Sequence, residues 1–362
     1  MRRPLLLGLC ASLALAAAAA PAASAAPTSP TSPAARAAAV VEVPITFTVR
    51  NVNRSLAPCA ADGKTYTIRG HLVGPAAALR RPAATPAGLA TIYLHGLGFG
   101  EFLWRYKNVA GYDYAANQAA AGQVSVVVDR LGYGASDQPV GTAVCVGSQA
   151  DIANQMVNAL RSGRYVLQQH TPVRFSKVAL AGHSYGGQIV QVAAYSFNNV
   201  DGVAIIGSSD TVISPTAATA TRYAARTCGL GGRLSEQGSR NYSSFGAPSG
   251  AATALFSNTD PRVLRTALPQ LNRDPCTDLL TFTTGTKTDL IYQKQITAPV
   301  LVVTGGSDAI FPPPAGPVQA SLMTGSSAVT QVEIPQTAHN FTLERTHGQF
   351  ESTMRSWLQT LG

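Results

Sequence analysis

One serine lies between two glycines in the segment Gly182–Gly186, directly after the short apolar run Val178–Ala181. The apolar run predicts a buried strand, and the residues Gly187–Phe197 predict a helix. A strand that turns this sharply into a helix needs glycines, because a Cβ atom at those positions would collide with neighbouring backbone. The turn would expose the serine hydroxyl near the positive end of the helix. We therefore predict that Ser184 is a nucleophile; the alternative is an ordinary serine in a glycine-rich loop.

A nucleophilic serine needs a base, and histidine accepts a proton near neutral pH. The histidines of the chain are His71, His95, His170, His183, His339 and His347. His339 follows the predicted strand Val329–Ile334 and precedes a predicted helix, and we expect the base on the loop after the last strand. His347 falls inside that helix and is expected to face solvent. His95 and His183 are expected to brace the loops that contain them.

The base needs an acidic partner that fixes its tautomer and stabilises its charged form. Asp308 follows the predicted strand that begins at Val300, and Asp210 follows the predicted strand Val203–Ile206. Both carboxylates therefore lie at the carboxyl ends of strands. We predict that Asp308 is the partner of His339, with Asp210 as the alternative.

A tetrahedral intermediate also needs hydrogen-bond donors for its negatively charged oxygen. The backbone N–H of Tyr185, next after the serine, is one predicted donor. The second is the backbone N–H of Leu97 in the segment His95–Gly100, which follows a predicted strand. The side chains of Tyr185 and Phe99 are candidates for the wall of a substrate pocket; the alternative is that they are ordinary core aromatics.

Short apolar segments alternate with helical patterns along most of the chain. The predicted strands are Ile45–Arg50, Thr65–Val73, Thr91–Leu94, Val124–Val128, Val178–Ala181, Val203–Ile206, Val300–Val303 and Val329–Ile334. The predicted helices are Leu103–Ala121, Gln149–Gln169, Gly187–Phe197 and Leu343–Leu361. The first two strands are expected to pair antiparallel, and the continuous apolar runs suit a parallel sheet covered on both faces. The pattern predicts an α/β fold with a mostly parallel, doubly wound sheet.

The alternation of strands and helices is interrupted once, between Thr211 and Thr297. This segment is too long for a simple loop in a compact domain. Ligands of such sheets bind outside the carboxyl ends of the strands, so an insertion after a strand is well placed to cover the site. We expect residues 211–297 to form a cap; the alternative is an insertion that lies away from the chemistry.

The first residues of the chain have the pattern of a secretory signal peptide. Met1–Arg3 is basic, Leu5–Ala20 is apolar, and Ala23–Ala25 supplies small residues for cleavage. We predict a signal peptide over residues 1–25, a disordered leader rich in Ala and Pro over 26–40, and a globular domain over 41–362. The alternative is an N-terminal membrane anchor, but the apolar run is shorter than a bilayer span. The sequence thus predicts a secreted, extracellular protein without stable membrane insertion.

Removing the signal peptide removes Cys10 and leaves Cys59, Cys145, Cys228 and Cys276. An even number of cysteines in an oxidising compartment indicates two disulfides, for which three connectivities are possible. We favour Cys59–Cys145 and Cys228–Cys276, because each pair then falls within one predicted structural unit. Metal binding is a weak alternative, since the chain has no C-x-x-C motif.

The formal net charge of +9 raises the question of anionic partners. The basic residues are scattered and lack interleaved aromatics, so a solvated basic surface is favoured over binding to nucleic acid. The sequence has neither a glycine-rich phosphate loop nor a metal cluster, and it implies no cofactor. The oligomeric state stays open.

Five motifs, taken together and in order, resemble the α/β-hydrolase superfamily. They are Leu94–Gly98 (LHGLG), Asp129–Asp137 (DRLGYGASD), Gly182–Gly187 (GHSYGG), Gly305–Asp308 (GGSD) and Thr337–Phe341 (TAHNF). The resemblance covers roughly residues 45–362 and implies the order Ser184, Asp308, His339 for a catalytic triad. The DRLGYGASD segment resembles a structural turn of that superfamily's esterases, haloperoxidase-like enzymes, dehalogenases and epoxide hydrolases.

What the resemblance implies about activity depends on the nucleophile. Dehalogenases and epoxide hydrolases of this fold use an aspartate, whereas this chain has Ser184. A serine favours acyl transfer to water, so we expect a secreted serine hydrolase that cleaves a small-molecule carboxylic ester. The alternatives are a cofactor-free perhydrolase, another acyl or amide hydrolase of the same fold, and a non-catalytic binding protein.

Overall fold

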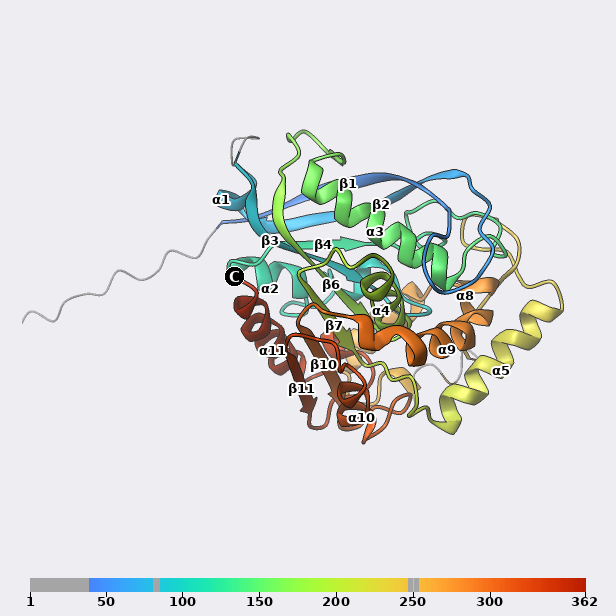
Figure 1. Ribbon diagram of the computed structural model, residues 1–362. Coiled ribbons are helices and arrows are strands. Elements are labelled where there is room, and N and C mark those ends of the chain that lie inside the picture. Colours follow the sequence, from blue (N-terminus) through green and yellow to red (C-terminus); the bar gives the residue numbers. More distant parts are fainter. Residues whose placement is uncertain (1–38, 81–84, 247–249, 251–253) are drawn as a thin grey trace, which may run out of the picture. The chain divides into compact units, whose positions relative to one another are not determined.

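The computed structural model describes residues 39–80, 85–246, 250 and 254–362 (Figure 1). These residues fall within one compact unit, Ala37–Gly362. The predicted signal peptide and nearly all of the predicted leader lie outside the described residues. In the part of the chain that is described, no helix has the length and apolar character needed to cross a membrane.

The centre of the unit is a sheet with the strand order β11–β10–β7–β6–β3–β4–β2–β1–β5. Its strands are β1 (Val40–Arg50), β2 (Thr65–Pro75), β3 (Ala87–Leu94), β4 (Ser125–Val128), β5 (Val166–Leu167), β6 (Phe175–His183), β7 (Gly202–Ile206), β10 (Val300–Gly305) and β11 (Val329–Ile334). All pairings from β11 to β4 are parallel. The pairings that add β2, β1 and β5 are antiparallel. The structure confirms the predicted α/β class and the mostly parallel, doubly wound sheet.

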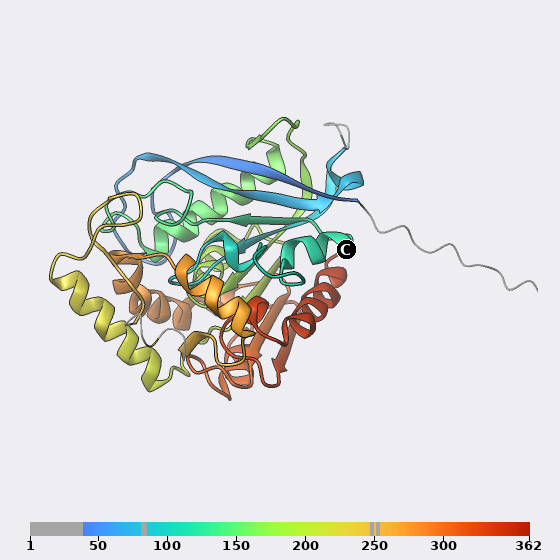
Figure 2. The ribbon, with the colours of Figure 1, turned by 180° about the vertical axis from the view of Figure 1, so that it is seen from behind.

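Helices cover both faces of this sheet (Figures 1 and 2). The helices outside the interrupting segment are α1 (Ala76–Leu79), α2 (Tyr114–Ala120), α3 (Val146–Ser162), α4 (Tyr185–Phe197), α10 (Ala315–Ser321) and α11 (His347–Thr360). Helices α3 and α4 pack on one face, and α2 and α11 pack on the other. Alternate strand side chains enter the two cores: Val126 and Val128 belong to the first and Val127 to the second. Burial on both faces explains why these strands are continuous apolar runs.

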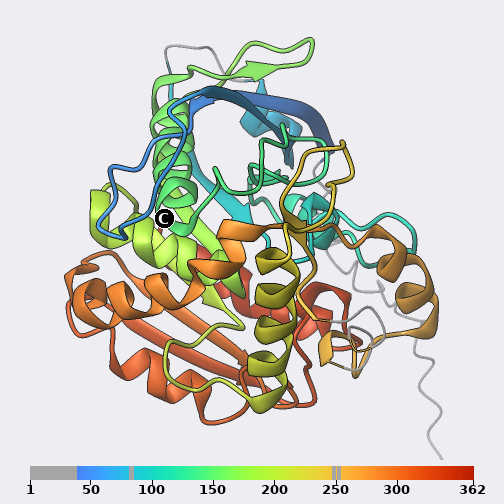
Figure 3. The same ribbon diagram turned by 90° about the vertical axis from the view of Figure 1, so that its right-hand side faces the viewer.

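Residues 211–297, hereafter the inserted segment, follow β7 and precede β10. Its described elements are α5 (Pro215–Gly229), β8 (Tyr242–Ser243), α7 (Pro261–Ala267), β9 (Asp274–Pro275), α8 (Cys276–Leu280) and α9 (Phe282–Tyr292). Strands β8 and β9 pair antiparallel in a small sheet of their own. Figure 3 shows the side of the molecule on which helix α5 of the inserted segment faces the viewer.

Both disulfides favoured from the sequence are formed. Cys59–Cys145 joins the loop after β1 to the start of α3, and Cys228–Cys276 joins α5 to α8 inside the inserted segment.

Three predicted helices are wrong in extent, and the one predicted over Leu343–Leu361 begins only at His347. The helix predicted over Gln149–Gln169 ends at Ser162, because Gly163 takes a left-handed conformation with φ of 71°. The chain then enters the short strand β5, which pairs with β1. Of the helix predicted over Leu103–Ala121, only α2 forms, and it begins after Asp113, whose side chain accepts the backbone N–H of Ala116 as an N-cap.

Candidate active site

Ser184 lies in the turn between β6 and α4, at the carboxyl ends of the parallel strands. Its φ of 55° and ψ of −119° lie outside the regions that residues with side chains ordinarily adopt. The turn is tight: a Cβ atom on Gly182 would lie 2.0 Å from the carbonyl oxygen of Gly186, and one on Gly186 would lie 2.4 Å from that of Leu94. The backbone N–H of Ser184 donates to the carbonyl of Ile206 at 2.8 Å, which fixes the turn against the end of β7.

His339 and Asp308 meet on the loops that follow β11 and β10. The Nδ1 atom of His339 lies 2.9 Å from Oδ2 of Asp308, and both side chains are almost fully buried. The other carboxylate oxygen accepts the backbone N–H groups of Ile310 and Phe311 at 2.7 and 3.1 Å. Because Nδ1–H donates to the carboxylate, Nε2 of His339 is left free to accept a proton.

His183 connects His339 to the turn that carries Ser184. The Nε2–H group of His183 donates to the carbonyl of His339 at 2.8 Å, and the two ring centroids are 4.7 Å apart. Phe311 lines the same cavity as Ser184, and its ring centroid lies 5.9 Å from that of His339. Among the described residues, no hydrogen bond joins the Ser184 hydroxyl to Nε2 of His339. Such bonds often become short only when substrate binds.

The two alternative residues, Asp210 and His347, have other partners. Oδ2 of Asp210 accepts the side-chain amide of Gln319 at 2.8 Å, and none of the hydrogen bonds between described residues joins Asp210 to His339. Burial, partly offset by hydrogen bonds, raises the pKa of Asp210 to about 6. His347 is half-buried at the start of α11 and bonds to Glu351 at 3.1 Å.

The predicted oxyanion donors lie on two loops that touch each other. A Cβ atom on Gly96 would lie 2.8 Å from Cβ of Ser184, so the loop after β3 contacts the serine turn directly. Leu97 and Tyr185 both line the cavity that contains Ser184. Within the described part of the chain, neither of their backbone N–H groups has a hydrogen-bond acceptor. Two donors are therefore available beside the serine.

The cavity that contains Ser184 is narrow and mostly apolar. Its wall consists of Leu97, Ser184, Tyr185, Ile213, Ala217, Thr221, Phe245, Leu279, Phe282, Ile310 and Phe311. Six of these residues, from Ile213 to Phe282, belong to the inserted segment. The cavity leaves about 20 Å³ for the centre of a water-sized sphere. Phe99 is not part of this wall in the described residues; it is buried in the core with its ring edge-on to that of His183.

The family of the chain follows from a match over most of this domain. The model of a family described as "Alpha/beta hydrolase family" matches residues 91–351. The protein belongs to the α/β hydrolase family. No curated protein matches its sequence.

Solved structures share the fold of this α/β hydrolase at low sequence identity. An esterase from Thermogutta terrifontis superposes with a TM-score of 0.58 at 18% identity, covering 87% of this chain and 99% of the esterase. A hydrolase from Pseudomonas aeruginosa PA01 superposes with a TM-score of 0.56 at 17% identity, covering 84% of this chain and 97% of that hydrolase. A monoacylglycerol lipase from Paleococcus ferrophilus superposes with a TM-score of 0.54 at 19% identity, covering 75% of this chain and 95% of the lipase. These likenesses establish the fold.

Two further histidines of the hydrolase are held neutral beside the site. Nε2 of His95 accepts the backbone N–H of Arg130 at 3.1 Å, so Nδ1 carries the proton and donates to the carbonyl of Gly96 at 2.8 Å. Burial lowers the pKa of both His95 and His183 well below the usual value. Across the described ranges, no group of three or more His, Cys, Asp or Glu residues is arranged to hold a metal ion.

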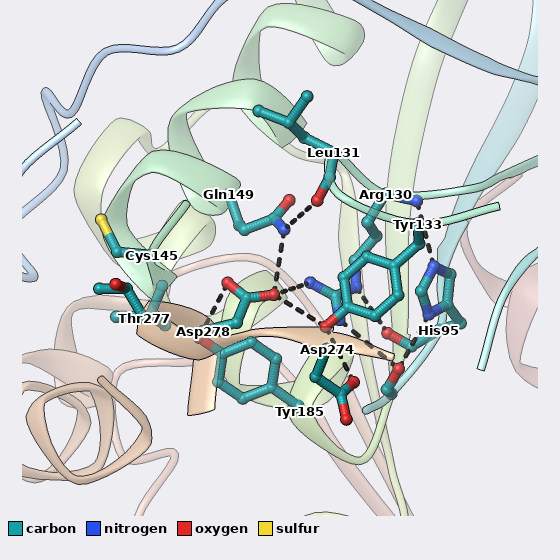
Figure 4. Close-up of polar contacts among 12 residues, drawn as sticks. His95, Arg130, Leu131, Tyr133, Cys145, Gln149, Tyr185, Asp274, Thr277 and Asp278 are labelled. Atoms are coloured by element: carbon teal, nitrogen blue, oxygen red, sulfur yellow. Dashed lines mark hydrogen bonds and ion pairs between the residues drawn. The ribbon is translucent and has the colours of Figure 1, made fainter. Parts of the chain in front are cut away.

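A buried polar network next to the site was not predicted from the sequence (Figure 4). It joins Arg130 and Tyr133 to Asp274 and Asp278 of the inserted segment. Burial raises the pKa of Asp278, and it raises the pKa of Asp274 to about 7. A signal existed in the sequence, because the two carboxylates flank Cys276 at a spacing of four residues, which places both beside a disulfide.

Proposed function

We propose that this protein is a serine hydrolase that cleaves carboxylic esters through an acyl-enzyme. The observation that carries the proposal is the hydrogen bond between Asp308 and His339 beside a turn that holds Ser184 in a strained conformation. Family membership supports hydrolytic activity in general. The printed names of two structural neighbours, an esterase and a monoacylglycerol lipase, agree with an ester as substrate.

In the first half of the reaction, Ser184 attacks the ester carbonyl. Nε2 of His339 takes the hydroxyl proton while Oγ forms a bond to the carbonyl carbon, and Asp308 stabilises the resulting imidazolium. The carbonyl oxygen becomes an oxyanion and accepts the N–H groups of Leu97 and Tyr185. When the tetrahedral intermediate collapses, the bond to the alcohol oxygen breaks and that oxygen takes the proton from His339.

In the second half, water replaces the alcohol. His339 removes a proton from the water as its oxygen attacks the acyl carbon, and the oxyanion again lies against the two N–H groups. Collapse breaks the bond to Oγ, which regains its proton from His339. The products are a carboxylic acid and an alcohol, and the enzyme returns to its starting state.

The lining of the cavity favours an ester with an apolar acyl group. The wall beside Ser184 consists mainly of aliphatic and aromatic side chains. The inserted segment supplies Phe245, Leu279 and Phe282 to that wall, which supports its role as a cap.

We also propose that the hydrolase is secreted. The basic and apolar pattern of residues 1–25 supports export, and the two disulfides are compatible with an oxidising compartment. Amino-terminal sequencing of the exported protein should begin near residue 26. An intact amino terminus on a protein retained in the membrane would instead support the anchor.

Covalent labelling with a fluorophosphonate tests the catalytic proposal. The probe should label Ser184, and peptide mapping should locate it there. Ser184→Ala should lose labelling and about 10⁵-fold or more in kcat on p-nitrophenyl acetate. Ser196→Ala, at the other end of α4, is the matched control and should keep both. Turnover that survives in the Ser184→Ala variant would exclude this serine, and a wild-type protein that neither reacts nor turns over would be a binding protein.

A further inference from the structure

The inserted segment places two fully buried carboxylates, Asp274 and Asp278, beside Tyr133 (Figure 4). Asp274 also contacts the loop that carries Leu97. Burying a carboxylate is unfavourable unless donors or a cation compensate it. The partners of these two carboxylates are therefore informative. They come from outside the inserted segment as well as from within it, and they include the backbone of the loop.

Asp278 compensates the charge of Arg130, and Arg130 in turn holds two carbonyl groups of the loop. The Nη1 atom of Arg130 donates to Oδ2 of Asp278 at 2.8 Å, and the two side chains are 1% and 0% exposed. The Nε atom donates to the carbonyl of His95 at 2.9 Å, and Nη2 lies 3.5 Å from the carbonyl oxygen of Gly96. Gln149 donates a further hydrogen bond to Asp278 at 3.2 Å.

Holding the carbonyl of Gly96 also sets the direction of the Leu97 N–H group. In a trans peptide unit the C=O and N–H bonds point in opposite directions. The carbonyl of Gly96 points toward the side chains of His95 and Arg130, at 2.8 and 3.5 Å. The N–H of Leu97, the other end of the same peptide unit, is therefore directed away from the network. This leaves it free as a donor in the cavity beside Ser184, which Leu97 lines.

Asp274 holds the next peptide unit of the loop. Its Oδ1 atom accepts the backbone N–H of Gly98 at 2.6 Å, and Oδ2 accepts the backbone N–H of Phe245 at 2.9 Å. The hydroxyl of Tyr133 bridges the two carboxylates and lies 3.1 Å from an oxygen of each. Asp274 thus ties the loop to Phe245, a residue of the cavity wall. The peptide units on both sides of Leu97 are fixed.

We infer that Asp274 and Asp278 are positioning residues, which hold the loop 95–98 so that the Leu97 N–H stabilises the oxyanion. The inference rests on the proposed function, because it assigns the inserted segment a part in the same catalytic site. In this arrangement the inserted segment does more than cover the cavity. It supplies the groups that fix one of the two oxyanion donors, and Asp274 links that donor to the cavity wall.

Asp274→Asn tests the inference, because the carboxamide keeps the shape but replaces one acceptor oxygen with an NH₂ group that faces a backbone N–H. Loss of a whole oxyanion donor costs about 10²–10³ in kcat, and a displaced donor should lose part of that. We expect kcat on p-nitrophenyl acetate to fall about 10–100-fold while KM changes by less than about 3-fold, because the donor acts mainly on the transition state. A trifluoromethyl ketone, whose adduct with Ser184 places an oxyanion at the same position, should bind more weakly by a similar factor.

Asp289→Asn is the matched control. Asp289 lies on α9 of the inserted segment and is also 0% exposed, and in the described residues it has no hydrogen bond to the loop 95–98. Its kcat should stay within about 3-fold of wild type. Equal kcat values for the two variants, or an effect of Asp274→Asn on KM alone, would overturn the inference. If Asp274→Asn does not fold, Tyr133→Phe removes one bridging hydroxyl and should lower kcat about 3–10-fold; an unchanged kcat there would overturn it as well.

Hydrogen exchange separates this inference from the proposed function. The Gly98 amide should exchange faster in Asp274→Asn than in wild type or Asp289→Asn, as followed by mass spectrometry of a peptide spanning residues 95–100. This holds even if Ser184→Ala retains activity and the proposed function fails. If Ser184 is the nucleophile but exchange and kcat of Asp274→Asn match wild type, the positioning role alone is wrong.

Discussion

Asp308 and Asp274 are both buried carboxylates that accept two backbone N–H groups each, but the sequence separation between carboxylate and donor differs greatly. Asp308 takes them from residues two and three positions further on. Asp274 takes them from Phe245 and Gly98, which are 29 and 176 residues away. The first arrangement is a local turn, and the second exists only when the inserted segment folds against the loop after β3.

Their remaining partners show what each arrangement does. Asp308 meets the imidazole of His339, which we propose as the base, and Asp274 meets the hydroxyl of Tyr133. The local turn therefore orients a side chain that moves protons, and the long-range one orients a backbone donor. One carboxylate is expected to act on every proton transfer, whereas the other acts only through the position of a loop.

The largest difference should appear in catalysis. Asp308→Asn keeps the size of the side chain but favours the wrong tautomer of His339, and kcat should fall about 10³–10⁴-fold, well beyond the loss expected for Asp274→Asn. Asp210→Asn is the control, since Asp210 follows the adjacent strand but bonds to Gln319. Its kcat on p-nitrophenyl acetate should stay within about 3-fold of wild type. A larger loss for Asp210→Asn than for Asp308→Asn would reverse the assignment of the acid.

A second difference should appear in stability and involves the other carboxylate of the network. Asp278→Asn leaves the buried guanidinium of Arg130 without its counter-charge, and the free energy of unfolding should fall by about 3–5 kcal/mol. The double variant Arg130→Met/Asp278→Leu removes both charges and should recover much of that loss. Urea unfolding measures both values.

The double variant also separates stability from positioning. It should remain about 10-fold or more slower than wild type in kcat, because no guanidinium then holds the carbonyls of His95 and Gly96. Recovery of both stability and kcat would mean that the ion pair serves folding alone. Recovery of stability without recovery of kcat would mean that the ion pair also positions the loop 95–98.

The contrast between local and long-range contacts also explains what the sequence could predict. Most of the parallel strands are short apolar runs, and parallel pairing brings their carboxyl ends to one edge of the sheet. The residues that directly follow such strands, among them Ser184, Asp308 and His339, could therefore be predicted to lie at that edge. Gly182 reports a steric requirement within five residues, whereas Gly186 reports one that comes from Leu94 at the end of the neighbouring strand β3. Such features depend on neighbours in the sequence or on a regular sheet.

Features that depend on how irregular segments pack could not be predicted in this way. Phe99 was expected either in the pocket wall or in the core, and only the packing of its loop against His183 decides for the core. The cavity wall from the inserted segment and the partners of Asp274 likewise depend on contacts between distant residues. Helix ends fall between these cases, because Gly163 was a visible stop signal within the predicted helix Gln149–Gln169.

The last predicted difference concerns pH. The charged and titratable groups that face Asp274 are Arg130, Tyr133 and, across the Tyr133 hydroxyl, Asp278. Burial raises the pKa of Asp274 from 3.8 to about 7. The folded protein therefore binds this proton more tightly than the unfolded chain, and the free energy of unfolding should fall as the pH rises from about 4 to about 7. Asp274→Asn lacks this titration. The unfolding free energy of wild type relative to this variant should fall by roughly 2 kcal/mol between pH 4.5 and 6.5, and level off above pH 7.

Asp260→Asn provides the control for that measurement. The side-chain and backbone hydrogen bonds of Arg262 lower the pKa of Asp260 to about 2, so this group is ionised in both the folded and the unfolded protein over most of the range from pH 4.5 to 7.5. The difference between wild type and Asp260→Asn in urea unfolding should be nearly constant across that range. A constant difference for Asp274→Asn as well would mean that the pKa of Asp274 is not raised, and that its contacts with Gly98 and Phe245 stabilise the ionised form at least as much as burial disfavours it. That result would support Asp274 as a hydrogen-bond acceptor for the loop but not its raised pKa. The positioning role of Asp274 and its titration can therefore be tested separately.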